Sequence, residues 1–382
     1  MEKIKLGELC KPSAGQIKED SDELIDYIDI SSVDNETKRV TGYQTIAFGE
    51  APSRARKAVK RGSVLVSTVR PNLNAVAMLE DDTPNITVAS TGFCILDCKE
   101  NVNNRFIFNF CKSKAFIDDM VSQATGASYP AVSDKIVRSA LVPNYSYEEQ
   151  CQISEVLDRV SAVIDNKKAE LSALEDLIIA RFVELFGNPI TNDKGWEVAE
   201  LNTVCDGIGD GLHGTPEYDE DGEYPFINGN NLMDGVIKVT PATKMVNEDT
   251  YKKHFIELTD NAILLSINGT LGKLAFYNGE EVMLGKSACY CNLKPEINRE
   301  FVYGVMKTDA FAGFLESNAT ASTIKNVGLK AIRGFKLILP PEELQFQFIE
   351  FAKQVDKSKF AVQKSLEETQ TLFDSLMQKY FG

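Results

Sequence analysis

The sequence predicts an α+β protein in which two repeated mixed α/β units are separated by two long antiparallel coiled-coil helices with pseudo-twofold symmetry. Three observations support this fold class: a heptad pattern in the middle of the chain, a second at its C-terminal end, and an offset of 195 residues that relates the two halves. The predicted division is a globular domain at 1–146, a central helix at 147–187, a second globular domain at 188–340 and a C-terminal helix at 341–382.

The central helix is predicted from apolar residues that recur at alternating steps of four and three. No Pro or Gly interrupts the chain between Glu148 and Phe186. This spacing places the apolar residues on one seam of a helix that packs against another helix. The residues expected at the seam are Ile153, Leu157, Val160, Ile164, Leu171, Leu174, Ile178 and Leu185.

The C-terminal helix repeats this pattern 195 positions later, where Phe381-Gly382 also repeats Phe186-Gly187. The antiparallel orientation of the two helices is inferred from the connectivity. The packing residues expected in the second seam are Phe348, Val355, Val362, Leu366, Phe373 and Leu376. Four polar residues interrupt the seams, and their side chains either snorkel to the seam edge or fix the register of the helices: Lys167, Arg181, Lys359 and Thr369.

Each globular domain is predicted to contain short strands, then a short helix, a polar loop and a last strand before the long helix. Runs of apolar residues bounded by Gly, Asn, Asp and Pro predict the strands. The predicted strands include 26–30, 62–67, 139–142, 225–227, 262–267 and 335–339. The predicted short helices span 104–122 and 299–317.

The composition indicates a soluble globular protein. Apolar residues make up 43% of the chain, but no run of eighteen apolar residues predicts a membrane span, and no apolar stretch follows the N-terminus as in a signal peptide. We therefore expect a cytoplasmic protein whose eight cysteines are reduced. The spacing of Cys94/Cys98 and of Cys289/Cys291 differs from that of a zinc-binding pair, which favours packed thiols over a metal site.

The net charge of −15 argues against a nucleic-acid partner when the chain is taken as a whole. Residues 1–146, however, carry 18 Lys and Arg against 19 Asp and Glu, so this domain is nearly neutral. It also contains a basic stretch between Lys38 and Arg70 in which Glu50 is the single acidic residue. The whole-chain charge therefore describes solubility more than it describes a binding site.

Catalytic chemistry is difficult to place in this sequence. His213 and His254 are the only histidines, and the motifs of serine hydrolases, HExxH metalloproteases and P-loop NTPases are absent. The glycine-rich segment 207–211 does not follow a clear buried strand, so a turn-rich loop is favoured over a phosphate-binding cradle. These absences leave few options for a histidine-dependent or nucleotide-dependent mechanism.

Local motifs in the second half resemble those of a known family. Gly195-Trp196-Glu197, followed by Leu201, is similar to the usual opening of a target-recognition domain. The run from Asp210 to Tyr218 and the segments after it match a recurrent pattern of such domains. Together with the alternation of globular domains and long helices, these motifs resemble the specificity subunit of type I restriction–modification enzymes. The first domain departs from the pattern, because no Asp-Gly-x-His sequence occurs near Ile17.

The resemblance implies a non-catalytic subunit that holds two methyltransferase subunits, and restriction subunits, on double-stranded DNA. Each recognition domain would read one half of a bipartite target, and the helices would set the spacer and dock the partners. S-adenosylmethionine, ATP and Mg would act in the partner subunits, with no cofactor in this chain. Three alternatives stay open: a specificity role in another phage-defence system, a protein-binding scaffold without DNA, and an enzyme that uses the 207–211 segment.

Candidate DNA contacts are the residue types that hydrogen-bond phosphates and base edges. In the first domain the candidates are Arg54, Arg56, Lys57, Lys60, Arg70, Thr125, Ser128, Tyr129 and Lys135. In the second domain they are His213, Thr215, Asn228, Asn230, Asn231, Asn268, Lys273, Lys286, Ser322, Thr323, Lys325 and Asn326. The competing interpretations are a solvated charged face for the basic residues and left-handed turns for the asparagines.

Overall fold

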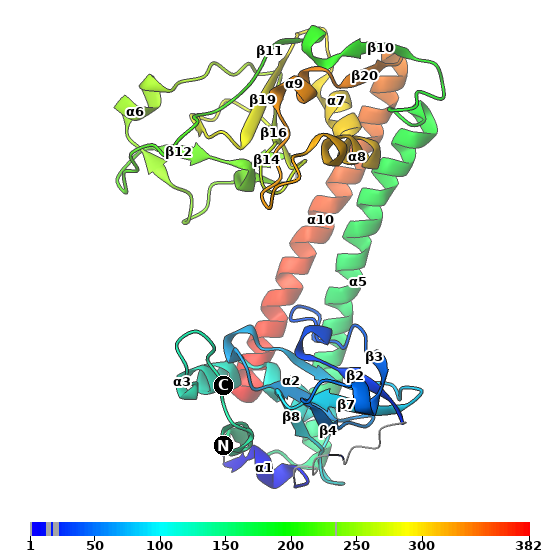
Figure 1. Cartoon of the computed structure of the whole chain (residues 1–382), viewed down its shortest axis with the longest axis vertical. Coiled ribbons are helices and arrows are strands. Elements are labelled where there is room, and N and C mark those ends of the chain that lie inside the picture. The colour runs from blue at the N-terminus through cyan, green and yellow to red at the C-terminus, as the bar shows by residue number, and fades with distance from the viewer. Residues whose placement is uncertain (1, 13–16, 18–22, 234) are drawn as a thin grey trace. The chain divides into compact units, whose positions relative to one another are not determined.

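The computed structural model describes residues 2–12, 17, 23–233 and 235–382, which form two compact units (Figure 1). Unit 1 comprises the chain up to Ala169 together with Gln363–Gly382, and unit 2 comprises Glu170–Val362. Each unit therefore combines one globular domain with a part of both long helices.

The two long helices are α5 (Tyr147–Phe186) and α10 (Glu342–Phe381), each of 40 residues. The predicted seam residues are buried or half-buried, whereas most residues between them are exposed. Leu157 is fully buried and Ile153, Ile164 and Val355 nearly so. The predicted pair of long helices is thus confirmed. Of the helices in the described part of the chain, none has the length and apolar character needed to span a membrane.

Packing inside each unit shows that α5 and α10 are antiparallel, as predicted. In unit 1, Leu157 near the start of α5 shares a core with Phe381 at the end of α10. In unit 2, Phe186 at the end of α5 shares a core with Phe348 near the start of α10. The beginning of one helix therefore lies with the end of the other in both units.

Both cores contain an equivalent contact between two phenylalanine rings. The ring of Phe381 lies 5.3 Å from that of Phe106 in unit 1, and the ring of Phe186 lies 5.1 Å from that of Phe301 in unit 2. Both residues of the second pair are 195 positions from those of the first in sequence. In each unit, the last aromatic residue of one long helix thus packs on a short helix. The two short helices occupy equivalent positions in the repeat.

Two charged residues within the seams place their charged ends next to carboxylates. Lys359 Nζ lies 2.9 Å from Glu175 Oε1, and Arg181 Nη1 lies 2.7 Å from Glu184 Oε2. The Arg181 guanidinium also lies over the Phe351 ring at 5.7 Å. The Lys359–Glu175 pair joins α10 to α5, whereas the Arg181–Glu184 pair lies within α5. The charged ends thus meet carboxylates, which agrees with snorkelling at the seam edge and, for Lys359, equally with a role in fixing register.

Unit 1 contains a four-stranded sheet of order β3-β2-β7-β4, a three-stranded sheet of order β6-β5-β8 and the pair β1-β9. The strands are β1 (Lys3–Lys5), β2 (Leu24–Ile28), β3 (Gln44–Ala47), β4 (Ala55–Ala58), β5 (Val64–Ser67), β6 (Val76–Met78), β7 (Ile86–Ser90), β8 (Phe93–Leu96) and β9 (Leu141–Pro143). The shorter helices are α1 (Leu6–Leu9), α2 (Asn104–Lys112), α3 (Lys114–Gln123), α4 (Asp134–Ser139), η1 (Ile30–Ser32), η2 (Phe48–Glu50) and η3 (Pro71–Leu73).

Unit 2 contains a four-stranded sheet of order β11-β19-β16-β17, a three-stranded sheet of order β15-β12-β18 and the pairs β13-β14 and β10-β20. The strands are β10 (Glu197–Glu200), β11 (Cys205–Asp210), β12 (Tyr224–Ile227), β13 (Leu232–Met233), β14 (Val236–Ile237), β15 (Met245–Val246), β16 (Ala262–Ser266), β17 (Leu274–Phe276), β18 (Met283–Leu284), β19 (Ala288–Leu293) and β20 (Lys336–Leu339). The shorter helices are α6 (Glu248–Lys253), α7 (Arg299–Met306), α8 (Asp309–Asn318), α9 (Leu329–Arg333), η4 (Leu201–Thr203) and η5 (Gly229–Asn231).

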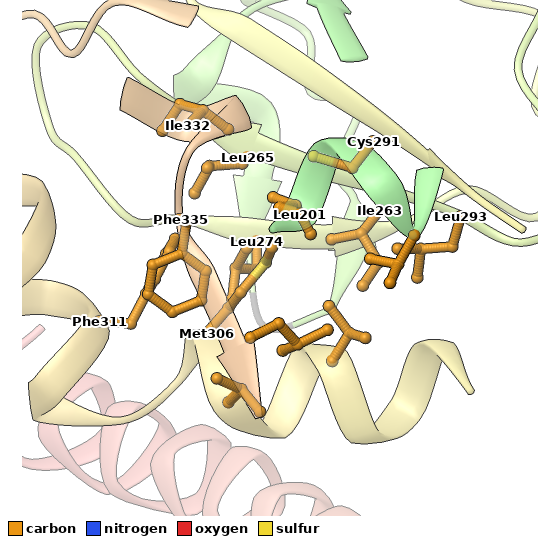
Figure 2. Close-up of a cluster of buried hydrophobic side chains, with 14 of the residues drawn as sticks. Leu201, Ile263, Leu265, Leu274, Cys291, Leu293, Met306, Phe311, Ile332 and Phe335 are labelled. Atoms are coloured by element: carbon orange, nitrogen blue, oxygen red, sulfur yellow. The ribbon is translucent and has the colours of Figure 1, made fainter. Parts of the chain in front are cut away.

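The core of unit 2 lies between its largest sheet and the helices α7, α8 and α9. Figure 2 shows Ile263 of β16 on the same side of the cluster as Cys291 of β19, and Leu265 near Ile332, with Phe311 and Phe335 at the opposite side from Ile263. These side chains are all buried. The eight cysteines of the chain are free thiols, six of them buried, and burial raises the pKa of Cys94 to about 12. A buried thiol of this kind behaves as a small apolar side chain.

The prediction of one short helix in each globular domain is wrong. The structure has two helices in each place, α2 and α3 in unit 1 and α7 and α8 in unit 2. Ser113 caps α3 by accepting a hydrogen bond from Phe116 N, and Thr308 caps α8 by accepting one from Phe311 N. A hydroxyl residue that caps a new helix ends the preceding one. The last strands also begin later than predicted, at Leu141 and Lys336: Ser139 belongs to α4, and Phe335 lies between the end of α9 and β20.

The turn-rich loop predicted at 207–211 is also wrong. Residues up to Asp210 form β11, which pairs antiparallel with β19. A Cβ atom at Gly209 would lie 2.7 Å from Tyr290 Oη, and one at Gly211 would overlap the Leu284 backbone. Glycine is needed at position 211 because the Leu284 backbone approaches closely, and the segment up to Asp210 is a strand rather than a phosphate-binding cradle.

Candidate nucleic-acid interface

Two loops of unit 1 meet beyond the end of β5. We call residues 68–74 and 124–132 loop pair 1. The backbone nitrogen of Arg70 donates to Pro130 O at 2.7 Å, and that of Val132 donates to Thr68 O at 2.8 Å. The second loop is closed on itself by two hydrogen bonds between Thr125 and Ala131, of 3.0 and 2.9 Å. These bonds hold a seven-residue loop against the segment that leaves the sheet.

Unit 2 builds the same arrangement from residues 267–273 and 319–327, which we call loop pair 2. Gly269 N donates to Lys325 O at 2.9 Å, and Val327 N donates to Ile267 O at 2.9 Å. The donors and acceptors correspond to those of loop pair 1 at offsets of 199 in the first segment and 195 in the second. Both units therefore present one backbone frame, formed by two segments that are distant in sequence.

The side chains of loop pair 1 are polar, cationic and aromatic. The Arg70 guanidinium lies over the Tyr129 ring, 4.6 Å from its centroid, and the Tyr129 side chain is 67% exposed. Thr125 and Ser128 are exposed beside them. A groove of about 650 Å³ runs between this pair and η1, and Arg70 is the only Lys or Arg among the described residues that line it.

The side chains of loop pair 2 differ in kind. Asn268 Nδ2 donates to Asn326 Oδ1 at 3.2 Å, so two amides meet where unit 1 has Val69 and Ala131. The exposed residues of the second segment include Ser322, Thr323, Ile324 and Lys325. Lys325 is held 2.6 Å from Glu316. Amide, hydroxyl and ammonium groups therefore share one edge of unit 2.

Further predicted residues of unit 2 gather at the same edge. Ile267 N donates to Ser287 O at 3.1 Å, which places the 286–287 segment next to loop pair 2. The Ser287 hydroxyl donates to Asn228 Oδ1 at 3.0 Å and accepts from Gly229 N at 2.9 Å. Ser287 carries no local sequence signal for this role, because its hydrogen bonds join segments that are distant in sequence. The side chain of its neighbour Lys286 is exposed.

His213 extends from the end of β11 toward solvent, with its side chain 67% exposed. Asp210 Oδ2 lies 2.8 Å from His213 Nε2 and holds the ring in place. Lys286 N donates to Leu212 O at 3.1 Å, which brings the His213 segment to the same edge. Thr215 is exposed farther along this loop.

Three further predicted residues of unit 2 differ in how far their side chains are hydrogen-bonded or exposed. Asn231 accepts from Asn228 N and donates to Lys238 O and Thr243 Oγ1, so it holds a turn together. Asn230 is exposed and Lys273 is half-buried at the start of β17. The structure therefore assigns Asn231 a role in local folding.

The basic stretch of unit 1 is not one row of free cations. Arg54 Nη2 lies 2.6 Å from Asp29, Lys57 Nζ lies 2.7 Å from Asp134, and Lys60 Nζ lies 4.0 Å from Asp97. The Arg56 guanidinium lies over the Phe48 ring at 5.2 Å. Lys135 on α4 is exposed. Several cations of the basic stretch are thus paired with carboxylates that are distant in sequence.

Position along the strands separates the basic residues further. Lys60 precedes β5, whereas Arg70 follows it, so they lie at opposite ends of that strand. Arg54 lies closer to loop pair 1, because Thr91 N donates to Arg54 O at 2.7 Å and Thr68 N donates to Gly92 O at 2.8 Å. Arg54 and Arg70 are therefore at one edge of the unit and Lys60 is not.

Comparison with known proteins gives consistent results. The sequence matches the family model of the "Type I restriction modification DNA specificity domain" over residues 1–176 and 193–369. The type I restriction enzyme MjaIX specificity subunit of Methanocaldococcus jannaschii is 22% identical over 353 residues, covering 84% of this chain and 76% of the relative. The EcoBI specificity subunit of Escherichia coli is 19% identical over 321 residues, covering 75% and 67%.

A solved chain from work on complex assembly and conformational transition of the type I R-M system has the same fold. Its TM-score is 0.61 at 23% identity, and the match covers 100% of this chain and 97% of that chain.

Proposed function

Because this chain belongs to the family of type I restriction modification DNA specificity domains, we propose that it recognises a bipartite sequence in double-stranded DNA. Loop pair 1 and the adjacent Arg54 contact one half of the target. Loop pair 2, with the 213 and 286 segments, contacts the other half. The observation that carries this proposal is the repetition of one loop frame, with the same interloop hydrogen bonds, in both units.

The chemistry of these edges suits DNA. Arg, Lys, Ser and Thr side chains donate to phosphate oxygens, whereas Arg and Asn side chains also read base edges in the major groove. Loop pair 1 offers Arg70, and loop pair 2 offers Asn268 and Lys325. The overall charge of −15 does not oppose such contacts, because screening in physiological salt limits the reach of distant charges to roughly 8 Å.

We propose that this chain is the non-catalytic member of a complex with two methyltransferase subunits and with restriction subunits. S-adenosylmethionine, ATP and Mg act in those partners, and the long helices set the spacer and dock them. Apolar side chains exposed on α5 and α10 support a docking role: Val163, Leu177, Phe360 and Leu372. Phe360 is 74% exposed, which is unusual for a residue of its size.

The most informative experiment is methylation sequencing of the DNA of a host that carries this chain with a type I methyltransferase. We expect methylated adenines in a bipartite motif with a fixed spacer. The matched control carries the methyltransferase alone and has no such motif. A contiguous motif, or methylation that does not depend on this chain, would contradict the proposal.

Binding to random duplex DNA as a function of salt separates a DNA reader from a protein scaffold. For a DNA reader, log K falls linearly with log salt with a slope of about −0.9 per phosphate contact, because bound cations are released. A scaffold that does not bind DNA shows no such slope.

A further inference from the structure

The two loop pairs share a backbone but differ at the position that faces the groove in unit 1. Arg70 in loop pair 1 corresponds to Gly269 in loop pair 2, since both donate the same backbone hydrogen bond to the second loop. Both residues have left-handed backbone conformations, with φ of 49° and 78° respectively. One frame thus carries a long cationic side chain in unit 1 and no side chain in unit 2.

The backbone at this position favours glycine. A left-handed conformation brings the Cβ of any other residue close to the following carbonyl group, whereas glycine has no Cβ. Unit 1 therefore keeps Arg70 where the backbone is strained, although unit 2 shows that glycine fits the same frame. Such strained residues cluster at functional sites.

The surroundings of Arg70 leave its hydrogen-bonding groups free for a ligand. Arg54, Lys57 and Lys60 each have a carboxylate partner, whereas no ion pair to Arg70 occurs among the described residues. Stacking on Tyr129 orients the plane of the guanidinium and leaves the N–H groups at its edge available. Two carboxylates line the adjoining groove: Asp34 accepts hydrogen bonds from Thr37, and Glu36 is paired with Lys168.

We propose that Arg70 is a specificity-determining residue that reads a guanine in the half-site of unit 1. A planar guanidinium donates two parallel hydrogen bonds to O6 and N7 of guanine, a pattern that no other base offers in the major groove. Unit 2 has no equivalent arginine, because Gly269 stands there. This inference rests on the proposed function and assigns it a base and a residue.

The test uses the full-length chain with its methyltransferase, and methylation sequencing of three proteins: the wild type, Arg70→Gly and Arg70→Lys. Arg70→Gly reproduces the residue of unit 2 and removes backbone strain, so its melting temperature should not fall. One guanine position in the half-site of unit 1 should then accept other bases. Discrimination at that position should drop by about 5- to 150-fold, which is the usual contribution of one bidentate contact.

Arg70→Lys is the matched control for charge. It keeps the positive charge but loses the two parallel donors, so binding to random DNA and its salt dependence should stay near wild type while the guanine position relaxes. Exchange of residues 1–146 identifies the half-site that belongs to unit 1. A bipartite wild-type motif that stays unchanged in folded Arg70→Gly overturns this inference alone. Absence of any bipartite motif in the wild type overturns the proposed function, and this inference with it.

Discussion

Loop pair 1 and loop pair 2 have the same backbone and different chemistry. Each is held by matching hydrogen bonds, yet Arg70 and Tyr129 stack in one, while Asn268 and Asn326 bond through their amides in the other. The exposed tips, Tyr129 and Ile324, are 67% and 65% exposed. The comparison shows that backbone bonds maintain the frame without fixing most of its side chains, the left-handed position of Arg70 and Gly269 being the exception. The side chains are therefore free to differ between the units.

The largest expected effect comes from exchanging one globular domain. Replacing residues 1–146 with the corresponding domain of another specificity subunit should change one half of the methylated motif completely and leave the other half intact. The reason is that loop pair 1 lies wholly within the exchanged segment. Methylation sequencing gives the result, and a change in both halves would show that the units do not read independently.

Lengthening both long helices should change the spacer. Four residues inserted after Ala169 and four after Val362, at the boundary between the units, add about 6 Å at 1.5 Å per residue. Four residues approximate one helical turn, so the seam returns nearly to its face. We expect both half-sites to be unchanged and the spacer to grow by about one or two base pairs of ~3.4 Å. An active protein with the original spacer would restrict the helices to partner docking.

Removing the aromatic residue that closes each core should affect the two units separately and to a similar degree. Phe186→Ala and Phe381→Ala each delete a buried ring, a change that lowers the free energy of unfolding by about 3–5 kcal/mol. Hydrogen exchange should accelerate in α7 for Phe186→Ala and in α2 for Phe381→Ala, because these helices contact the rings. Acceleration in the opposite unit would contradict the packing described here.

The smallest expected effect is a difference in stability between variants of two lysines at equivalent positions, Lys112 and Lys307. Lys112 is half-buried over the Phe108 ring, and burial lowers its pKa to about 8, whereas the Lys307 side chain is exposed. Below pH 8 Lys112 is charged in both the folded and unfolded states, and its burial destabilises the fold. Between pH 8 and its unfolded pKa of about 10.5, the folded state has lost the proton and the penalty fades.

Lys112→Met should therefore raise the free energy of unfolding at pH 7 by roughly 1–3 kcal/mol, and this advantage over wild type should shrink between pH 8 and 10.5. Lys307→Met is the matched control, with little effect at any pH. Denaturation at several pH values measures both differences. An advantage for Lys112→Met that grows with pH would show that the sign of the pKa shift is wrong.

Much of the fold was predictable because local periodicity determines it. The seam residues of α5 and α10 follow from heptad spacing, and the repeat follows from matching positions such as Phe186 and Phe381. The breaks at Ser113 and Thr308 were missed, although a hydroxyl residue inside an apolar helical pattern is a signal for a cap. The strand β11 was missed because its glycines are those of a closely packed strand and look like those of a turn.

The candidate site was only partly predictable, because contacts distant in sequence assemble it. The polar loops at 125–129 and 322–326 stand out by composition, but their pairing with 68–74 and 267–273 depends on the tertiary fold. The partners of the basic stretch were equally hidden, since Lys57 and Asp134 are 77 positions apart. Charge in a sequence therefore indicates where cations occur and does not show which of them are free.

Site-specific photo-crosslinking tests the central claim most directly. A photoreactive amino acid replaces either Tyr129 or Ile324, the exposed tips of the two loop pairs, in a complex with DNA that carries the methylated motif. A third protein carries it at Phe360, on the exposed face of α10, as a control. If one loop frame reads DNA twice, position 129 crosslinks to one half-site and position 324 to the other. Crosslinks from both tips to the same half-site, or from position 360 but from neither tip, would contradict the account.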